Sequence, residues 1–310
     1  MRLLFCADPL HPRRADDTYS SEYEAARSAG ANVSLLNFEA LIYEHDPTAA
    51  IIQIPAADAE TLGIYRGWML TVDHYAQLFG ALQERHISLI NTPEQYAHCH
   101  LLPLSYAEIE PYTPKTIWVP VAEFALADLA AYLLPFGDSP IIVKDYAKSR
   151  KHEWAQACFM PSAADTRAAA QVVQTFLSRQ GSDFTGGLVF REFEEFESLT
   201  MHPQSGMPLT REFRLVFLDG ELLLSSRYWD SGEYTGETPP REMFTQIALT
   251  IPSRFFTMDV AKTKTGDWRI IELGDAQVAE LPPDTDQSAF FRDCLASVSK
   301  NNGELPDVSA

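Results

Sequence analysis

The chain has 310 residues, 46% of them hydrophobic, which is enough apolar material for two domains or for one large domain with subdomains. Its 24 basic and 43 acidic residues give a net charge of −19. Such a charge repels phosphate backbones, so we expect that nucleic acid is not a general partner.

The cysteines and the apolar runs predict a cytoplasmic protein. Cys6, Cys99, Cys158 and Cys294 lie far apart and form no CxxC pair, which argues against a zinc site or a disulfide framework. No apolar run approaches the roughly 20 residues of a membrane span, and the run after Arg2 is too short for a signal peptide. We therefore expect no membrane partner.

The first part of the chain predicts an α/β arrangement. Its expected elements are a strand over residues 2–7, a helix over residues 20–31 and a strand over residues 32–38. Ser21 and Glu24 have the spacing of a capping box for that helix. "TPEQ" at 92–95 predicts another helix start, with a capping Thr, a Pro at the first helical position and a Gln three residues after the Thr.

Prolines gather at positions 103, 111 and 114, and we place a domain boundary there. The expected organisation is an α/β domain over residues 1–112, a second domain over residues 113–300 and a flexible tail over residues 301–310. Just before the boundary, His98 and His100 stand two residues apart near a helix end. That spacing places them on different faces, so we interpret them as ordinary residues and not as a metal site.

The second domain predicts a change from alternating helices and strands to long strands. Its expected elements are strands over residues 116–119, 140–146 and 186–193, helices over residues 122–134 and 165–181, and hairpins within residues 210–229 and 255–273. Asp219–Gly220 is the expected turn of the first hairpin. This pattern favours an α+β domain with antiparallel sheets.

Two carboxylates face each other in the last hairpin. With Thr265–Gly266 as a two-residue turn, Asp259 lies directly across from Glu272. Like charges in that position destabilise a sheet unless something neutralises them. Mg²⁺ or Mn²⁺ would do so, because such ions bind carboxylates together with substrate phosphates, and Asp275 could add a third oxygen. The structural alternative is a pair that is solvated or bonded to an arginine such as Arg269.

A strand of the preceding hairpin, "LTREFRLVF" at 209–217, carries unusual charges. Alternation places Glu212 and Arg214 on one face. Charged groups in such an apolar strand are costly unless they are paired or bind a ligand, and a guanidinium is well suited to a phosphoryl group. An internal Glu–Arg pair is the alternative. Arg227 leaves the same hairpin and is a further candidate.

Lys144 ends a buried strand and needs a partner there, either Asp145 or a phosphate. The loop that follows adds Lys148, Arg150 and Lys151, which beside a phosphate site would form a lid or a substrate clamp. Farther on, the mixed acidic and aromatic turn in "LVFREFEEFESL" (188–199) could hold an adenine and the hydroxyls of its ribose.

These features, in this order, resemble the ATP-grasp superfamily. "VKDYAKSRKHEW", "REFRLVFLDGELL" and "IELGDAQV" resemble, more narrowly, the ATP-grasp clade named for two arginines and a lysine, which is known mostly from bacterial and phage genomes. "YRGWML" (65–70) and "LINTPEQY" (89–96) resemble its N-terminal preceding domain. The resemblance covers roughly residues 60–280 and implies an α/β N-terminal domain followed by an α+β ATP-grasp fold. Two subdomains with antiparallel sheets would clasp the nucleotide, with a hinge near 192–197.

The resemblance also implies roles for single residues. Lys144 would contact the α- and β-phosphates, with Lys115 and Lys148 as further nucleotide contacts. Glu192 and Phe193 would lie at the adenine hinge, Glu195 or Glu197 at the ribose, Arg214 with Arg227 at the transferred phosphoryl group, and Asp259, Glu272 and Asp275 at the metal.

The function implied is that of an ATP- and Mg²⁺-dependent ligase that joins an unknown carboxylate to an unknown amine through an acyl phosphate. The alternative is an ATP-binding assembly chaperone, or a modifier of a protein or nucleic-acid partner, with little turnover. "EFRLVF" also resembles the ATP-grasp chaperone that assembles a eukaryotic translation initiation factor. Two departures bear on catalysis: a basic stretch replaces a Gly-rich loop, and Glu272-Leu273-Gly274-Asp275 replaces Glu-x-Asn, which leaves one or two metal ions open.

Overall fold

The computed structural model describes residues 1–201 and 208–301. Of the tail expected over 301–310, only its first residue falls within these ranges. Within them, no helix is both long enough and apolar enough to cross a membrane. All four cysteines are buried and free.

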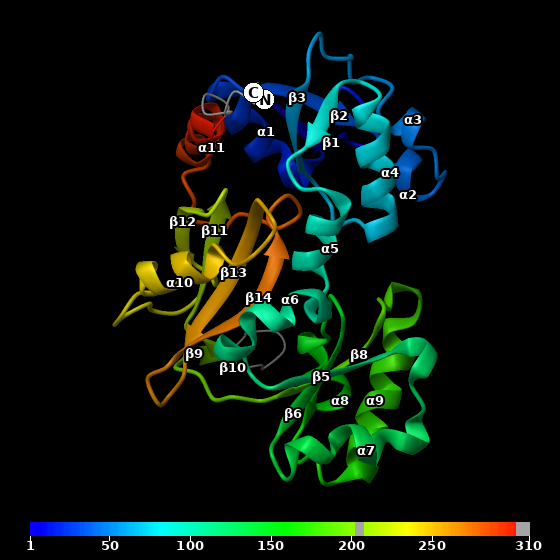
Figure 1. Cartoon of the computed structure of the whole chain (residues 1–310), viewed down its shortest axis with the longest axis vertical. Helices are drawn as coiled ribbons and strands as arrows, with labels where there is room; N and C mark the ends of the chain where they lie inside the picture. Colours follow the sequence, from blue (N-terminus) through cyan, green and yellow to red (C-terminus); the bar gives the residue numbers. More distant parts are fainter. Residues whose placement is uncertain (202–207, 302–310) are drawn as a thin grey trace, which may run out of the picture.

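The N-terminal part is an open parallel sheet in the order β2-β1-β3-β4 (Figure 1). Its strands are β1 (Arg2–Cys6), β2 (Asn32–Leu36), β3 (Thr61–Arg66) and β4 (Ile87–Leu89). Its helices are α1 (Ser20–Ser28), α2 (Phe38–Ile42), α3 (Pro47–Ala50) and α4 (Val72–Gln83), and α5 (Pro93–His100) and α6 (Leu102–Ile109) lead on to the rest of the chain. The expected α/β arrangement is confirmed.

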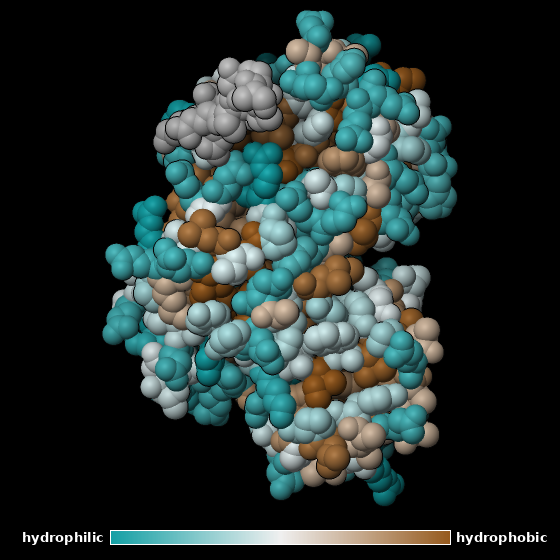
Figure 2. All heavy atoms as spheres, in the orientation of Figure 1, coloured by the Kyte–Doolittle hydropathy of each residue, from teal (hydrophilic) through white to brown (hydrophobic). Residues whose placement is uncertain are grey.

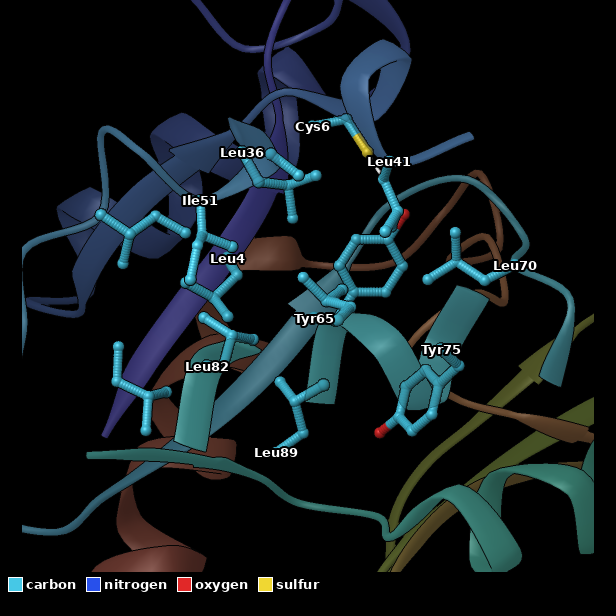
Figure 3. Close-up of a cluster of buried hydrophobic side chains, with 14 of the residues drawn as sticks. Leu4, Cys6, Leu36, Leu41, Ile51, Tyr65, Leu70, Tyr75, Leu82 and Leu89 are labelled. Carbon is cyan, nitrogen blue, oxygen red and sulfur yellow. Dashed lines mark hydrogen bonds between the residues drawn. The ribbon is translucent and has the colours of Figure 1, made fainter. Parts of the chain in front are cut away.

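Strand alternation sends the side chains of β1 into two different cores. Leu4 and Cys6 point to one face, where they pack with Tyr65 and the leucines drawn in Figure 3. Leu3 and Phe5 point to the other face, which α1 covers together with the C-terminal helix α11 (Gln287–Asn301). The end of the described chain thus returns to the first domain (Figure 1).

The remainder is built on two antiparallel sheets. One sheet has the order β5-β8-β6-β7, with β5 (Thr116–Pro120), β6 (Ile141–Asp145), β7 (Phe159–Met160) and β8 (Gly187–Glu192). The other has the order β12-β11-β13-β14, with β11 (Glu212–Leu218), β12 (Glu221–Arg227), β13 (Phe255–Lys262) and β14 (Trp268–Asp275). A short ribbon of β9 (Ser198–Met201) and β10 (Pro208–Thr210) completes the strands, and the helices are α7 (Leu129–Leu133), α8 (Trp154–Ala157), α9 (Thr166–Gln180) and α10 (Arg241–Ala248). The α+β fold with two antiparallel sheets is confirmed.

Of the two capping boxes expected from the sequence, the structure contains one. The capping box at Thr92 and Gln95 is present in full. The one expected at Ser21 and Glu24 is wrong: a 3₁₀ turn precedes α1, and Asp16 caps that turn by accepting a hydrogen bond from the N–H of Thr18. The chain is therefore already helical before Ser21, which lies inside the first turn of α1.

The helix expected over residues 122–134 is also wrong. Two 3₁₀ turns, at Val121–Glu123 and Leu126–Asp128, precede the short α7, and Phe124 between them is extended. Phe124 packs against Tyr132 and the core between α7, α9 and the sheet. Tertiary packing thus overrides the helix propensity of this alanine- and leucine-rich stretch.

The first hairpin turns at Asp219 and Gly220, as expected. Their φ angles of 50° and 80° are those of a type I′ turn, the connection that fits the twist of two antiparallel strands. On the outer surface seen in Figure 2, hydrophobic side chains reach solvent as separate spots among hydrophilic ones. Outside the grey atoms, that face shows no single broad apolar patch.

Candidate functional site

The last hairpin holds its two carboxylates opposite each other by an unexpected route. Its loop has three residues, because Thr263 donates its backbone N–H to the Asp267 carbonyl, so the expected two-residue turn is wrong. A three-residue loop alone would place Asp259 opposite residue 271. A β-bulge between Asp259 and Val260 shifts the register by one residue and pairs Asp259 with Glu272.

Arg191, on β8 of the other sheet, holds this bulge. Its guanidinium donates to the carbonyl oxygens of Ile271 (2.5 Å) and Ile270 (3.1 Å). A bulge leaves ladder groups unpaired, and here the facing sheet supplies their partner. The two sheets are thus joined directly behind the carboxylate pair.

Each carboxylate of the pair has its own cation. Arg214 on β11 donates two hydrogen bonds of 2.8 Å to Asp259, and Lys144 on β6 lies 2.6 Å from Glu272. Although burial acts in the opposite direction, Lys144 and Lys151 lower the pKa of Glu272 to about 2. The repulsion expected in the hairpin is therefore offset by one cation from each sheet. Arg269 is not one of these cations, because it pairs with Glu194 at 3.1 Å.

Asp275 does not join the pair. It stands opposite Phe256, on the core side of the hairpin, where it accepts hydrogen bonds from the Asn91 side chain (2.6 Å) and from the Gln277 backbone (2.9 Å). Burial raises its pKa to about 7. Over residues 1–201 and 208–301, no group of three or more His, Cys, Asp or Glu side chains could hold a metal ion. Metal binding by Asp259, Glu272 and Asp275 stays a prediction.

A cavity of about 310 Å³, here called the charged cavity, opens at the carboxylate pair. Its wall combines the second sheet, the loop after β14 and the N-terminal domain. The side chains used below are Met69, His100, Arg214, Tyr228, Asp259, Glu272 and Glu280.

A second cavity of about 270 Å³, here called the apolar cavity, lies between the two sheets on the other side of the charged residues. Its lining includes the segment 192–196, Ile142, Ile271, Trp154 and Trp229, with Lys151, Arg191 and Glu212 among them. Of the expected nucleotide contacts, Glu192, Phe193 and Glu195 line this cavity. Glu197 does not; it bonds Arg211 at 2.9 Å instead.

Glu212 is a charged group without a direct partner. It is buried on β11, and no hydrogen bond or ion pair to its carboxylate occurs in the described part of the chain. Burial raises its pKa to about 7, against the opposing charge of Lys151. Although burial acts in the opposite direction, the carboxylates of Glu212, Glu272 and Asp259 raise the pKa of Lys151. The internal Glu212–Arg214 pair, which was the structural alternative, is not formed, because Arg214 bonds Asp259.

Five of the expected site residues line neither cavity: Lys144 and Glu197, described above, and Lys115, Arg227 and Lys148. Lys115 donates to the Pro135 carbonyl and stands over the ring of Phe136. Arg227 pairs with Asp284. The Lys148 backbone closes a turn on Asp145, and its side chain lines neither cavity.

His100 belongs to the site, which corrects its interpretation as an ordinary residue. It lines the charged cavity, and its ring stacks on Tyr96 with 5.1 Å between centroids. Burial lowers its pKa to about 4, so the imidazole is neutral at physiological pH. His100 follows the buried Tyr96 by four residues, and this helical spacing in the sequence places both side chains on the same, inner face of α5. His98 faces elsewhere, beside Glu108.

Two antiparallel sheets that close on a cavity between them define an ATP-grasp protein. The chain belongs to a particular family of that class: the model of the ATP-grasp domain, R2K clade family 3, matches residues 135–293, more than half of the chain. The resemblance found in the sequence is thereby confirmed. No curated protein matches the chain.

Solved structures share the fold over nearly the whole chain. ATP-grasp ligase PsnB, complexed with precursor peptide PsnA2 and AMPPNP, is 12% identical, with 95% of this chain and 96% of that chain covered and a TM-score of 0.58. The RimK domain protein ATP-grasp from Sphaerobacter thermophilus is 14% identical (95% and 98% covered, TM-score 0.58). D-cycloserine synthetase DcsG is 14% identical (96% and 100% covered, TM-score 0.57). At these identities the likeness shows the fold alone.

Proposed function

We propose that the protein is an ATP-dependent ligase that activates a carboxylate as an acyl phosphate and joins it to an amine. The observation that carries this proposal is the Asp259–Glu272 pair, which is balanced by Arg214 and Lys144 and lines the charged cavity. Membership of an ATP-grasp family and the fold shared with ATP-grasp ligases support it.

The nucleotide would occupy the apolar cavity. Adenine would lie between Ile142 and Ile271 beside the segment 192–196, because apolar walls from both sheets suit a flat heterocycle. Glu212 would accept hydrogen bonds from the ribose hydroxyls, which gives that buried carboxylate the donors it lacks. It replaces Glu195 and Glu197 as our candidate for the ribose.

The phosphates would extend from there towards the charged cavity. Lys144 and Lys151 would contact the phosphates. Lys144 forms an ion pair with Glu272, and Lys151 is close enough to lower the pKa of Glu272. Arg214 would face the transferred group, for which a guanidinium supplies two donors in fixed geometry. Binding a triphosphate would draw these cations away from Asp259 and Glu272.

The carboxylate pair fits Mg²⁺ or Mn²⁺. Hard oxygen donors suit such ions, and Mg²⁺ typically takes one or two protein carboxylates plus phosphate oxygens, so a cluster of three protein ligands is not required. A bound ion would supply charge neutralisation for the transferring phosphoryl group. Asp259 and Glu272 would hold it, whereas Asp275 is tied to Asn91 and Gln277.

In the reaction, a carboxylate oxygen of the substrate displaces ADP from the γ-phosphorus, and the P–O bond to the β-phosphate breaks. The amine nitrogen then attacks the acyl carbon, inorganic phosphate leaves, and the amine loses a proton to water. Arg214 would stabilise the charge on the transferred group. The charged cavity would hold the substrate carboxylate beside it.

The carboxylate could belong to a peptide or protein. PsnB is complexed with a precursor peptide, and the macrocyclase MdnC from Microcystis aeruginosa MRC is bound with precursor peptide MdnA. MdnC is 11% identical with a TM-score of 0.55. The charged cavity opens next to Met69 and Glu280, where a longer substrate could leave it.

The test is calorimetric titration of AMPPNP with and without Mg²⁺. We expect Mg²⁺-dependent binding that Asp259→Asn abolishes. Asp267→Asn is the matched control, because that acid belongs to the same hairpin but lies in its exposed loop. No binding by the wild type under either condition would overturn the proposal. ADP release that needs both a carboxylate and an amine would separate a ligase from a chaperone that only binds ATP.

A further inference from the structure

Two consecutive residues after β12 place one aromatic ring in each cavity. Tyr228 lines the charged cavity and Trp229 lines the apolar cavity. The two rings touch edge to face, with centroids 4.7 Å apart and planes at 70°. Any change at one cavity therefore has a direct contact path to the other.

The indole of Trp229 contains a donor without an acceptor. Its Nε1 is buried and has no hydrogen-bond partner in the described part of the chain. Trp68 behaves differently, since its indole N–H donates to Asp16 at 3.3 Å. An unpaired buried donor is costly, so such a group needs a partner, which can be a water, an ion or a ligand. In the same cavity, the Glu212 carboxylate lacks donors.

A nucleoside supplies what both groups lack. Its ribose hydroxyls donate to a carboxylate, and its ring nitrogens and ribose oxygens accept from an indole N–H. Trp229 and Glu212 are also linked through the backbone: Tyr228 donates its N–H to the Glu212 carbonyl at 2.9 Å, and Tyr234 bridges that carbonyl and the Trp229 N–H. The backbone at Trp229 is thus fixed, and rotation of the side chain is the motion left to it.

On the other side, Tyr228 supports the cation of the candidate site. The guanidinium of Arg214 lies over its ring, 4.7 Å from the centroid, while donating two hydrogen bonds to Asp259. Movement of the Tyr228 ring changes the environment of Arg214.

We propose that Trp229 senses the bound nucleotide: its indole N–H donates to the nucleoside, and its contact with Tyr228 passes that event to Arg214. This inference rests on the proposed function, because it takes the apolar cavity as the nucleotide site. A nucleoside in the apolar cavity would then change the contact between Tyr228 and Arg214 before the second substrate binds. Such coupling is reciprocal, so an occupied charged cavity would also tighten nucleotide binding.

The first experiment records ¹H–¹⁵N spectra of the full chain, in which the five tryptophans give separate indole signals. Trp229→Phe identifies its own signal by loss. The probe is adenosine, which lacks phosphates and so cannot reach Arg214 by charge. We expect adenosine to shift the Trp229 indole signal downfield and to leave the Trp68 signal in place.

The second experiment measures affinity for AMPPNP with Mg²⁺. Trp229→Phe keeps one aromatic ring but removes the N–H donor together with the second ring of the indole. We therefore expect binding to weaken at least roughly 2- to 10-fold, the worth of one hydrogen bond. Trp68→Phe is the matched control and should bind like the wild type. Trp229→Phe leaves no group unpaired in the free protein, so its folding is retained, which the dispersed spectrum verifies.

The relay to Arg214 has its own test. The Arg214 Nε–H signal, identified by its loss in Arg214→Lys, should shift when adenosine binds to the wild type. In Tyr228→Leu, adenosine should still move the Trp229 signal but not the Arg214 signal. An Arg214 shift that persists in Tyr228→Leu would overturn the relay.

The outcomes separate this inference from the proposed function. Wild-type protein that binds AMPPNP, with an unmoved Trp229 signal and unchanged affinity in Trp229→Phe, would overturn the sensing role and leave the nucleotide site standing. Wild-type protein that binds neither adenosine nor AMPPNP would overturn both.

Discussion

The β13–β14 hairpin carries carboxylates on both faces, and the two faces neutralise them differently. On the cavity face, Asp259 and Glu272 meet the side-chain cations Arg214 and Lys144. On the core face, Asp275 meets only neutral donors, from Asn91 and Gln277. The pKa of Glu272 is lowered to about 2, and that of Asp275 is raised to about 7.

The difference teaches which of these carboxylates can exchange partners. Lysine and arginine reach the cavity face on long side chains. In the function we propose, both would move to a phosphate, which would free two carboxylates for a metal ion. The amides on the core face are fixed: Asn91 also bonds the Phe255 backbone, and Gln277 bonds Tyr65 and Tyr75. One face is arranged for ligand exchange and the other joins two domains.

The largest expected effect is on the cavity face. Glu272→Gln removes a charge but keeps the shape, so we expect ATP-dependent ADP release to fall by about 100-fold or more, because the transferring phosphoryl group loses its charge stabilisation. The free energy of unfolding should fall because the buried Lys144 loses its partner, but by less than the about 3–5 kcal/mol of a fully buried pair, since the Glu272 side chain is 36% exposed. Coupled-enzyme assays and urea unfolding measure the two quantities. A variant with wild-type turnover would remove Glu272 from the candidate site.

The core face should respond in the opposite sense. Both carboxylate oxygens of Asp275 accept hydrogen bonds, from Asn91 and from Gln277, and Asp275→Asn replaces one of these acceptors by an NH₂ donor. We therefore expect a loss of about 1–3 kcal/mol in the free energy of unfolding. Affinity for AMPPNP should stay within about 2-fold of the wild type, because the Asp275 carboxylate is held by Asn91 and Gln277 although the residue lines the charged cavity. Urea unfolding and calorimetry give both numbers. A stable variant that no longer binds AMPPNP would return Asp275 to the metal site.

The same comparison predicts a pH dependence. The pKa of Asp275 is about 7 in the folded protein against an ordinary 3.8, so its contribution to stability is fully present below pH 3.8 and is lost as the pH rises to 7. Between pH 5 and pH 8 the unfolding free energy of the wild type should fall relative to Asp275→Asn by about 1–3 kcal/mol. Groups that titrate in both proteins cancel in this difference. Parallel pH profiles would mean that Asp275 is already ionised at pH 5.

The sequence predicted the fold class and the proximity of four charged side chains. Lys144, Arg214, Asp259 and Glu272 are close together as expected, because each stands in a strand whose alternation fixes its side-chain direction. The facing pair was expected from a two-residue turn, whereas the structure has a longer loop and a bulge that cancel each other. A bulge depends on Arg191 from a distant strand, and no local pattern contains that partner.

Residues outside strands were harder to place. The acidic segment 192–197 offered several ribose candidates. Among the described residues that line the apolar cavity, the buried carboxylate without a partner is instead Glu212, which alternation alone had placed beside Arg214. His100 enters the site because α5 packs on β14, a contact between distant parts of the chain. Asp275 follows Glu272 by three residues, and that odd spacing in a regular strand already predicts the opposite face.

The smallest expected effect separates two lysines that the resemblance both assigned to the nucleotide, Lys144 to its phosphates and Lys115 as a further contact. Lys115→Ala should change AMPPNP affinity by less than about 2-fold, because its ammonium bonds the Pro135 carbonyl outside both cavities. Lys144→Ala should weaken binding by about 10-fold or more, since the phosphates lose a buried cation and Glu272 loses its partner. Calorimetry on both variants at one Mg²⁺ concentration measures the ratio. Equal losses in the two variants would mean that Lys115 turns towards the nucleotide when the nucleotide binds. The geometry of the free protein would then not decide which cations hold the phosphates.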